Sequence, residues 1–337
     1  MAEPGVRRPS IRDVAAAAGV SYQTVSRVLN EPALVRPSTA ERVQRVIKEL
    51  GYRPSKAARS LVRRDSTTIG AVGIHGNLYG PIQMTVAIDE GARSRGYASA
   101  SLAVRDDSEE SRTEAREHLL NLGVDGVIVV AWTEAMMELA LDFAKELPTC
   151  VVAEDDVPAG LARVHSDHVS GARQATEALL GAGRRRIGHL SGPATWSEAQ
   201  SRVSGWREAG GDACGPLVEA GWEPRDGYDG VDRLLAVEPA LDAIFAANDQ
   251  VAIGALRRLQ ELGRSVPDDI AVVGYDDIDI CPFQAVPLAT VRQPFGDVGS
   301  AVVDLLFQVM GGGPAASLTL PSEFVWRESA GRDLSTM

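Results

Sequence analysis

The chain has 337 residues, of which 45% are hydrophobic and 24% are charged, so it is long enough to form two or three domains with buried cores. Its three cysteines are too few and too widely spaced for a disulfide framework or a zinc cluster. No apolar stretch has transmembrane length, and the N-terminus MAEPGVRRPS lacks the apolar region of a signal peptide, so we expect a cytoplasmic protein.

The charge is distributed unevenly along the chain. Residues 1–64 contain 13 Lys and Arg against 5 Asp and Glu, which gives a net charge of +8. The remaining 21 basic and 41 acidic residues give −20, and the two parts sum to the net charge of −12. A small basic module joined to an acidic body is typical of a nucleic-acid-binding protein whose body is repelled by phosphates.

The first predicted elements are two short helices within residues 10–30, SIRDVAAAAGVSYQTVSRVLN. Ser10 and Asp13 form a capping-box pattern, which predicts a helix that begins at Ile11. Gly19 stands where a left-handed residue ends that helix, and Ser21 can cap the next one. A tight turn between two helices of this length is typical of a helix-turn-helix motif.

The second helix, predicted over residues 22–29, has an apolar stripe on one side. Val25, Val28 and Leu29 follow helical spacing. The side chains that face outward are Tyr22, Gln23, Ser26 and Arg27. Such side chains suit base edges and phosphates, and a helix-turn-helix presents the start of its second helix to the major groove in this way. An ordinary surface helical hairpin is the alternative.

A third helix is predicted from the pattern that follows. Ser38 and Glu41 form another capping-box pattern, and Gly51 stands at the end of the helix. The apolar positions between them, at helical spacing, are Val43, Val46, Ile47 and Leu50. This third amphipathic helix supplies the core that a two-helix motif lacks. The headpiece is therefore predicted to cover residues 1–54.

Residues 55–66 are predicted to link the headpiece to the rest of the chain. Ser55 to Arg64, SKAARSLVRR, are helix-forming residues, but ten residues are too few for a stable isolated helix. We interpret this segment as a hinge that becomes ordered on binding. A plain flexible basic linker is the alternative.

These three segments resemble the headpiece of the lactose-repressor family of bacterial regulators, and the triplet Tyr22, Gln23 and Arg27 is similar to that of the family's eponymous member. In that family the hinge helix pairs with its dimer mate and inserts a leucine into the minor groove. The resemblance implies that the triplet contacts bases, that Leu61 is the inserted leucine and that Ala58 lets two hinges approach. The full set of implied DNA-binding residues is Ser21, Tyr22, Gln23, Thr24, Ser26, Arg27, Asn30, Tyr52, Ala58 and Leu61.

From Thr68 onward, predicted strands alternate with predicted helices of ten or more residues. Such alternation predicts parallel sheets with right-handed crossovers. The pattern restarts at RVHS, which suggests two doubly wound lobes. The predicted core covers residues 67–337, with one lobe of about 67–162 plus 293–320 and another of about 163–290 plus 321–337. The predicted fold class is an all-α helix-turn-helix headpiece joined to an α/β core, which matches the periplasmic-binding-protein-like core of the same family.

A ligand site is expected where polar or aromatic residues directly follow predicted strands, since ligands bind at the carboxyl ends of strands in doubly wound sheets. Each candidate also has a purely structural alternative, such as helix capping for Asn248, ion pairing for Arg202 or packing for Trp222. Together, however, an Arg, an Asn, carboxylates and a Trp suit the hydroxyls and C–H surface of a sugar. The candidate effector-binding residues from this pattern are Glu154, Arg202, Trp222, Asn248 and Asp276, and the resemblance to the lactose-repressor family implies Phe295 as a sixth.

The resemblance implies a homodimeric transcriptional repressor that binds double-stranded operator DNA and is released by a sugar effector, a galactoside or a related sugar. The segment after Phe324 has no leucine heptads, which favours a dimer. No nucleophile–base constellation or phosphate-binding loop is present, so we expect neither an enzyme nor a cofactor or metal site. His165 and His168, after a predicted strand, are interpreted as polar loop residues.

Two alternatives stay open. A regulator of the same family could use a purine as a corepressor that strengthens DNA binding. A solute-binding protein of a transport system would share the core, but the basic headpiece argues against it. Inside the cell, a regulator of this kind would be at the nucleoid when it is bound to its operator.

Overall fold

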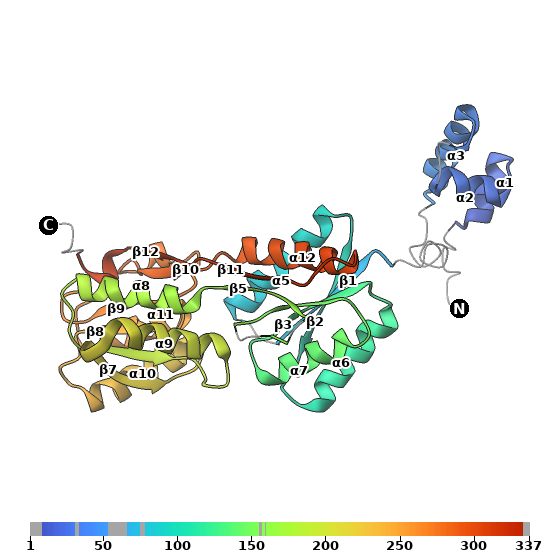
Figure 1. Ribbon diagram of the computed structural model, residues 1–337. Helices are drawn as coiled ribbons and strands as arrows, with labels where there is room; N and C mark the ends of the chain where they lie inside the picture. Colours follow the sequence, from blue (N-terminus) through green and yellow to red (C-terminus); the bar gives the residue numbers. More distant parts are fainter. Residues whose placement is uncertain are drawn as a thin grey trace, which may run out of the picture. The chain divides into compact units, whose positions relative to one another are not determined.

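The computed structural model describes residues 9–30, 34–52, 66–74, 78–154, 157–158 and 160–332. The chain divides into two compact units, Met1–Ser66 and Thr67–Met337, and the division falls at the end of the predicted hinge. Figure 1 shows the headpiece helices and the two lobes of the larger unit.

The headpiece contains three helices, α1 (Ile11–Ala18), α2 (Tyr22–Asn30) and α3 (Pro37–Leu50). The predicted capping box is present, because Ser10 Oγ accepts a hydrogen bond from the backbone N–H of Asp13 and the Asp13 carboxylate accepts one from the backbone N–H of Ser10. Gly19 ends α1 with φ +61°, the left-handed region that glycine favours. These local signals set the angle of the turn between α1 and α2.

The start of α3 differs from the prediction. The helix begins at Pro37 with Arg36 as its N-cap, and no side chain caps it, so the predicted capping box of Ser38 and Glu41 is wrong. Proline at the first helical position explains the shift, because its fixed φ suits a helix and its missing N–H costs nothing there. Leu50, at 38% exposure, lies outside the core. The buried core of the headpiece consists of Val14, Ala15, Ala18, Val25, Val28, Val43 and Val46.

The first sheet of the larger unit has the strand order β11–β5–β4–β3–β1–β2, and all its pairs are parallel. Every residue of the central strand β3, GVIVV, is buried, which is typical of a parallel sheet covered on both faces. The strands are β1 (Thr68–Ile74), β2 (Ala98–Val104), β3 (Gly126–Val130), β4 (Thr149–Val152), β5 (Ala162–Ser166) and β11 (Ser317–Leu320).

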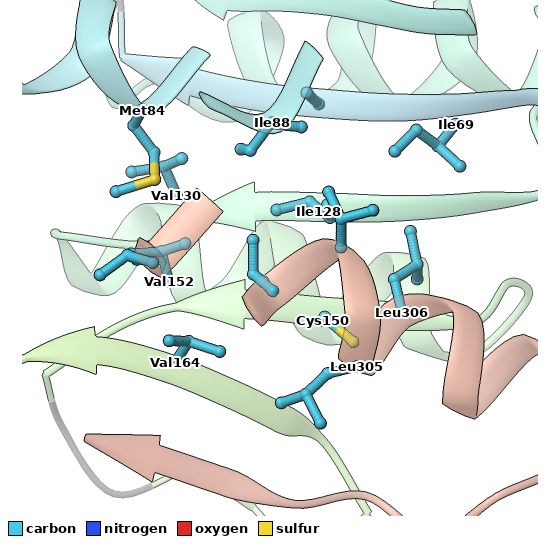
Figure 2. Close-up of a cluster of buried hydrophobic side chains, with 14 of the residues drawn as sticks. Ile69, Met84, Ile88, Ile128, Val130, Cys150, Val152, Val164, Leu305 and Leu306 are labelled. Carbon is cyan, nitrogen blue, oxygen red and sulfur yellow. The ribbon is translucent and has the colours of Figure 1, made fainter. Parts of the chain in front are cut away.

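Helices cover both faces of this sheet. On one face lie α5 (Tyr79–Ser94) and α12 (Phe295–Met310), and on the other lie α6 (Glu109–Leu122) and α7 (Glu134–Ala144). Figure 2 shows the first of these cores, in which Leu305 and Leu306 of α12 lie beside Cys150 of β4. Two buried apolar layers of this kind make the first lobe a doubly wound α/β fold.

The second sheet has the strand order β7–β6–β8–β9, again all parallel. Helices α8 (His168–Gly181) and α9 (Ser197–Gly210) cover one face, and α10 (Pro224–Val237) and α11 (Asp249–Glu261) cover the other. The strands are β6 (Ile187–Ser191), β7 (Cys214–Glu219), β8 (Ala243–Ala246) and β9 (Ala271–Val273). The remaining elements are the antiparallel pair β10 (Thr290–Arg292) and β12 (Glu323–Val325) and the short 3-10 helices η2 (Gly211–Ala213), η3 (Cys281–Phe283) and η4 (Glu328–Ala330).

The lobe boundary expected at residue 163 is wrong for one strand. The RVHS segment forms β5, which pairs with β4 and β11 in the first sheet rather than beginning the second. The chain passes from the first lobe to the second after β5 and after β11, and it returns after β10, as Figure 1 shows. A strand–helix pattern in the sequence contains no information on which sheet supplies the hydrogen-bond partners of a strand. Among the described residues, no helix combines the length and the apolar character needed to cross a membrane.

Candidate functional site

The outward face of α2 carries the side chains predicted to contact bases. Tyr22, Gln23 and Arg27 are exposed, whereas Val25 and Val28 are buried in the headpiece core. Tyr22 is 51% exposed although it is aromatic. An exposed aromatic residue beside an amide and a guanidinium gives this helix hydrogen-bonding and apolar groups for base edges.

The other predicted DNA-binding residues of the headpiece frame this face. Ser21 Oγ accepts a hydrogen bond from Thr24 N at 3.1 Å and lies 2.9 Å from Thr24 Oγ1, so both residues help to fix the start of α2. Ser26 is half-buried, and Tyr52 packs against the headpiece core. Three predictions lie outside what the structure describes, namely the side chain of Asn30 and the residues Ala58 and Leu61.

A cavity lies in the larger unit, at the carboxyl ends of strands from both lobes. Five of the six predicted effector-binding residues line it, and Glu154 does not. The predicted residues that the cavity brings together are Arg202, Trp222, Asn248, Asp276 and Phe295.

Arg202 is the cation of the cavity and is only 3% exposed. Its Nη1 donates to the carbonyl oxygen of Ala247, and its Nε donates to Nδ1 of His168 at 3.4 Å. The guanidinium carbon lies 4.0 Å from the centre of the Tyr275 ring, and Nη2 lies 3.9 Å from Asp276 Oδ1. These contacts hold a buried cation in one orientation, as its burial requires.

Asp276 follows β9 and has φ +109°, an unusual conformation for a residue other than glycine. Gln293 Nε2 donates to Asp276 Oδ1 at 2.6 Å, and Asp276 N donates to the carbonyl oxygen of Val291. Burial raises the pKa of Asp276 to about 6, although Arg202 opposes the shift. A strained backbone and a carboxyl group with a raised pKa are features that cluster at binding sites.

Asn248 serves both the cavity and the fold. Its Oδ1 caps α11 by accepting a hydrogen bond from Val251 N at 2.8 Å, and its Nδ2 donates to the carbonyl oxygen of Trp222 at 3.0 Å. The next residue, Asp249, is fully buried and accepts hydrogen bonds from Thr290 Oγ1 and Ile278 N. Asn248 therefore ties the segment that carries Trp222 to the start of α11.

Aromatic side chains form a large part of the cavity wall. Trp196 lies between the other two tryptophans, with ring centroids 5.8 Å from Trp132 and 5.3 Å from Trp222. Phe295 meets Tyr79 edge to face at 5.9 Å. Flat apolar faces next to buried hydrogen-bonding groups suit a ligand with both C–H surface and hydroxyls.

Glu154, the sixth predicted residue, lies behind the cavity wall rather than in it. Its Oε1 is 2.9 Å from His165 Nδ1 and 3.6 Å from His168 Nε2, and its Oε2 accepts a hydrogen bond from Ser201 Oγ. The interpretation of the two histidines as polar loop residues is wrong, because His165 lies in β5 and His168 is a buried residue that begins α8 and lines the cavity. Burial and the nearby Arg202 lower the pKa of His168 well below its usual value.

Several cavity residues were not predicted. Three of them follow a strand closely, as Trp132 follows β3, His168 follows β5 and Gln293 follows β10, so the rule used for the other candidates could have found these three. The unpredicted lining residues are Leu78, Tyr79, Gly80, Pro81, Trp132, His168, Trp196, Glu198 and Gln293. Within the described parts of the chain, no group of three His, Cys, Asp or Glu side chains is placed to hold a metal ion.

Two family models match the two units. Residues 10–55 match the model described as bacterial regulatory proteins, lacI family, and residues 176–330 match the periplasmic binding protein-like domain. The chain is 34% identical to the HTH-type transcriptional regulator CelR of Thermobifida fusca, over 96% of this chain and 98% of CelR. It is 33% identical to the HTH-type transcriptional repressor PurR of Haemophilus influenzae (strain PittEE), over 89% of this chain and 90% of PurR.

Solved structures show the same fold. The lac repressor dimer bound to operator and the anti-inducer ONPF matches with a TM-score of 0.87 at 30% identity, over 96% of this chain and 99% of that chain. The complex of CelR with cellobiose matches with a TM-score of 0.71 at 31% identity, over 96% and 100% of the two chains. The predicted helix-turn-helix headpiece and parallel-sheet core are thus confirmed, and special closeness to the lactose repressor stays a prediction. The chain belongs to the lacI family of bacterial regulatory proteins.

Proposed function

We propose that this regulator is a cytoplasmic repressor whose headpiece binds operator DNA and whose core binds a sugar that releases it. The cavity carries this proposal, because it combines a buried guanidinium, a buried carboxyl group and tryptophan faces between two lobes. A galactoside or a cellobiose-like sugar offers the matching hydroxyls and C–H faces. The complex of CelR with cellobiose supports a sugar of this kind.

The two sites must be coupled for the sugar to act. A ligand shifts an equilibrium only if it binds one arrangement of the protein more tightly than another. The sugar contacts residues from both lobes, such as Tyr79 on one side and Arg202 on the other, so its affinity depends on how the lobes are placed. In this proposal the sugar binds best to the arrangement that binds DNA weakly.

On the DNA, Tyr22, Gln23 and Arg27 contact bases in the major groove. Ser21, Thr24, Asn30 and Tyr52 position phosphates. Leu61 of the hinge inserts into the minor groove, and Ala58 lets the two hinges of a dimer approach.

A homodimer is part of the proposal, since a near-palindromic operator needs two headpieces. Exposed apolar side chains support it. Ile82 and Val86 lie one turn apart on α5, and Ile280 and Phe283 lie at η3, where Phe283 is 81% exposed. Light scattering of the wild type and of Phe283→Glu tests this part. An unchanged dimer in the variant would show that Phe283 does not lie in the dimer interface.

A purine corepressor is the second candidate, and the similarity to PurR is the observation that favours it. The two candidates differ in the sign of the effect, because a corepressor strengthens DNA binding and an inducer weakens it. A thermal-shift panel of sugars and nucleobases, followed by gel shifts on a selected operator with any compound that binds, separates them.

The variant Asp276→Ala tests the role of the cavity. It should abolish release of operator DNA by the sugar while operator binding itself persists. Asp277→Ala is the neighbouring control, because Asp277 pairs with Arg327 and Arg292 rather than lining the cavity. Release by the sugar at the wild-type concentration in the Asp276 variant would contradict the proposed site.

A further inference from the structure

Glu198 is a buried carboxyl group in the cavity wall that the fold itself does not satisfy. It lies in the first turn of α9 and is 5% exposed. Its Oε2 is buried and has no hydrogen-bond partner among the described residues, and the same is true of Nε1 of Trp222. Glu198 and Trp222 both line the cavity, and each therefore brings one buried polar atom without a partner among the described residues to its wall.

Unpartnered buried polar atoms are uncommon because each loses its hydrogen bonds to water on folding. Glu198 also lies near other negative groups, Glu154 and Asp276, and its burial raises its pKa to about 8. Arg202, one turn along α9, donates instead to Ala247 and His168. The fold thus keeps the carboxyl group of Glu198 available for a bound ligand.

The same surroundings determine which kind of hydrogen-bond donor on a ligand the site can bind. The guanidinium of Arg202 already lies 5.5 Å from the ring centre of Trp222, against the wall where a ligand would stack. A second cation there would be repelled by Arg202 and would compete for the same aromatic face. A neutral hydroxyl meets neither obstacle, and it can donate to either protonation state of the carboxyl group.

We propose that Glu198 determines the specificity of the effector site: its Oε2 accepts a hydrogen bond from a hydroxyl of a neutral pyranoside that stacks on the tryptophan wall, while Trp222 Nε1 donates to an oxygen of the same sugar. This inference rests on the proposed function, since it assumes that the cavity binds a sugar. It adds the chemical requirement that the ligand present a donor and an acceptor to these two atoms. A site that hydrogen-bonds a ligand hydroxyl discriminates strongly against analogues that lack it.

The experiment measures binding of cellobiose and of lactose to the full-length protein by isothermal titration calorimetry. For whichever sugar binds the wild type, Glu198→Ala should raise Kd at least tenfold, and Glu198→Gln, which keeps an acceptor oxygen, should raise it less. Glu208→Ala, an exposed glutamate on the same helix, is the matched control and should leave Kd unchanged. The melting temperature of ligand-free Glu198→Ala should not fall, because the substitution removes a buried group that has no partner.

A series of monodeoxy analogues of that sugar provides the second measurement. One analogue should lose affinity for the wild type and bind Glu198→Ala with the same Kd as the parent sugar. Equal Kd values for the parent sugar in the wild type and in Glu198→Ala would overturn the role of Glu198 and leave the sugar site intact. The chitosan disaccharide is a cationic probe, and tighter binding of this probe than of cellobiose would overturn the neutral-hydroxyl assignment. Failure of the wild type to bind any sugar of the thermal-shift panel would overturn the proposed function and this inference together.

Discussion

Glu154 Oε1 lies 2.9 Å from Nδ1 of His165, while Glu154 Oε2 accepts a hydrogen bond from Ser201 on α9 of the second lobe. His165 Nε2 in turn lies 2.8 Å from Thr319 Oγ1 on β11. This row of polar side chains runs from the edge of the first sheet to the helix that carries Arg202. It joins the two lobes directly behind the cavity, so it bears on how a ligand in the cavity affects their arrangement.

Glu154→Ala should therefore weaken the contact between the lobes. We expect a loss of about 1–3 kcal/mol in the free energy of unfolding, because His165 and Ser201 lose the hydrogen-bond partner that they share. We also expect the sugar to release operator DNA at a changed concentration. Urea unfolding and sugar-titrated gel shifts measure the two effects. Glu177→Ala, an exposed glutamate on α8, is the control, and equal behaviour of the two variants would show that the row does not join the lobes.

Arg27→Ala tests base contact by the recognition helix. The exposed guanidinium of Arg27 should donate hydrogen bonds to one specific base. Its loss should therefore weaken operator binding by about 1–3 kcal/mol and weaken binding to random DNA much less. Fluorescence anisotropy with both DNAs at one salt concentration gives the two losses. Arg42→Ala on α3 removes the same charge from another exposed site of the headpiece. Equal losses on the two DNAs for Arg27→Ala would refute its base-reading role.

Gly19→Ala tests the turn of the helix-turn-helix. A Cβ at Gly19 would meet no atom within 4 Å, so the cost of the substitution comes only from the left-handed backbone at φ +61°. We expect the headpiece to lose about 1 kcal/mol of stability, measured by circular dichroism during thermal unfolding of the full-length protein. Gly19→Asn should lose less, since asparagine tolerates this conformation better. An alanine variant as stable as the wild type would contradict the assigned strain.

Residues close in sequence made the headpiece predictable. Capping by Ser10 and Ser21 and the left-handed Gly19 depend on neighbours within three or four positions, and the structure has all of them. The predicted start of α3 was wrong because Pro37, rather than a residue capped by Ser38, begins the helix.

Features set by tertiary pairing were harder to predict. The sequence of β5 predicts a strand, but it does not indicate that this strand pairs with β4 and β11. The role of His165 likewise depends on its contact with Glu154, which lies eleven residues earlier, just after β4. Trp132 follows β3 and Trp196 immediately precedes α9, and their contact joins two lobes whose relative orientation the sequence pattern does not determine.

The stability of the core should depend on pH in a defined direction. Burial raises the pKa of three carboxyl groups, to about 8 for Glu198, about 7 for Asp249 and about 6 for Asp276. Each binds a proton more tightly in the folded protein than in the unfolded chain, so stability falls as the pH rises toward the folded pKa. Buried His189, with its pKa lowered to about 4, and His168 act in the opposite direction, but only below about pH 6.5, where unfolded histidine gains a proton.

The window between pH 6.5 and pH 8 therefore isolates Glu198 and Asp249. In the absence of sugar, the free energy of unfolding should fall across this window, at up to about 1.4 kcal/mol per pH unit for each proton that the folded state retains. Glu198→Gln should make the fall smaller, most clearly between pH 7 and pH 8, because glutamine has no proton to release. Urea unfolding of the wild type, Glu198→Gln and the exposed control Glu208→Gln at three pH values measures the slopes. The control should keep the wild-type slope. A Glu198→Gln slope equal to that of the wild type would mean that Glu198 is already ionised in the folded protein at neutral pH.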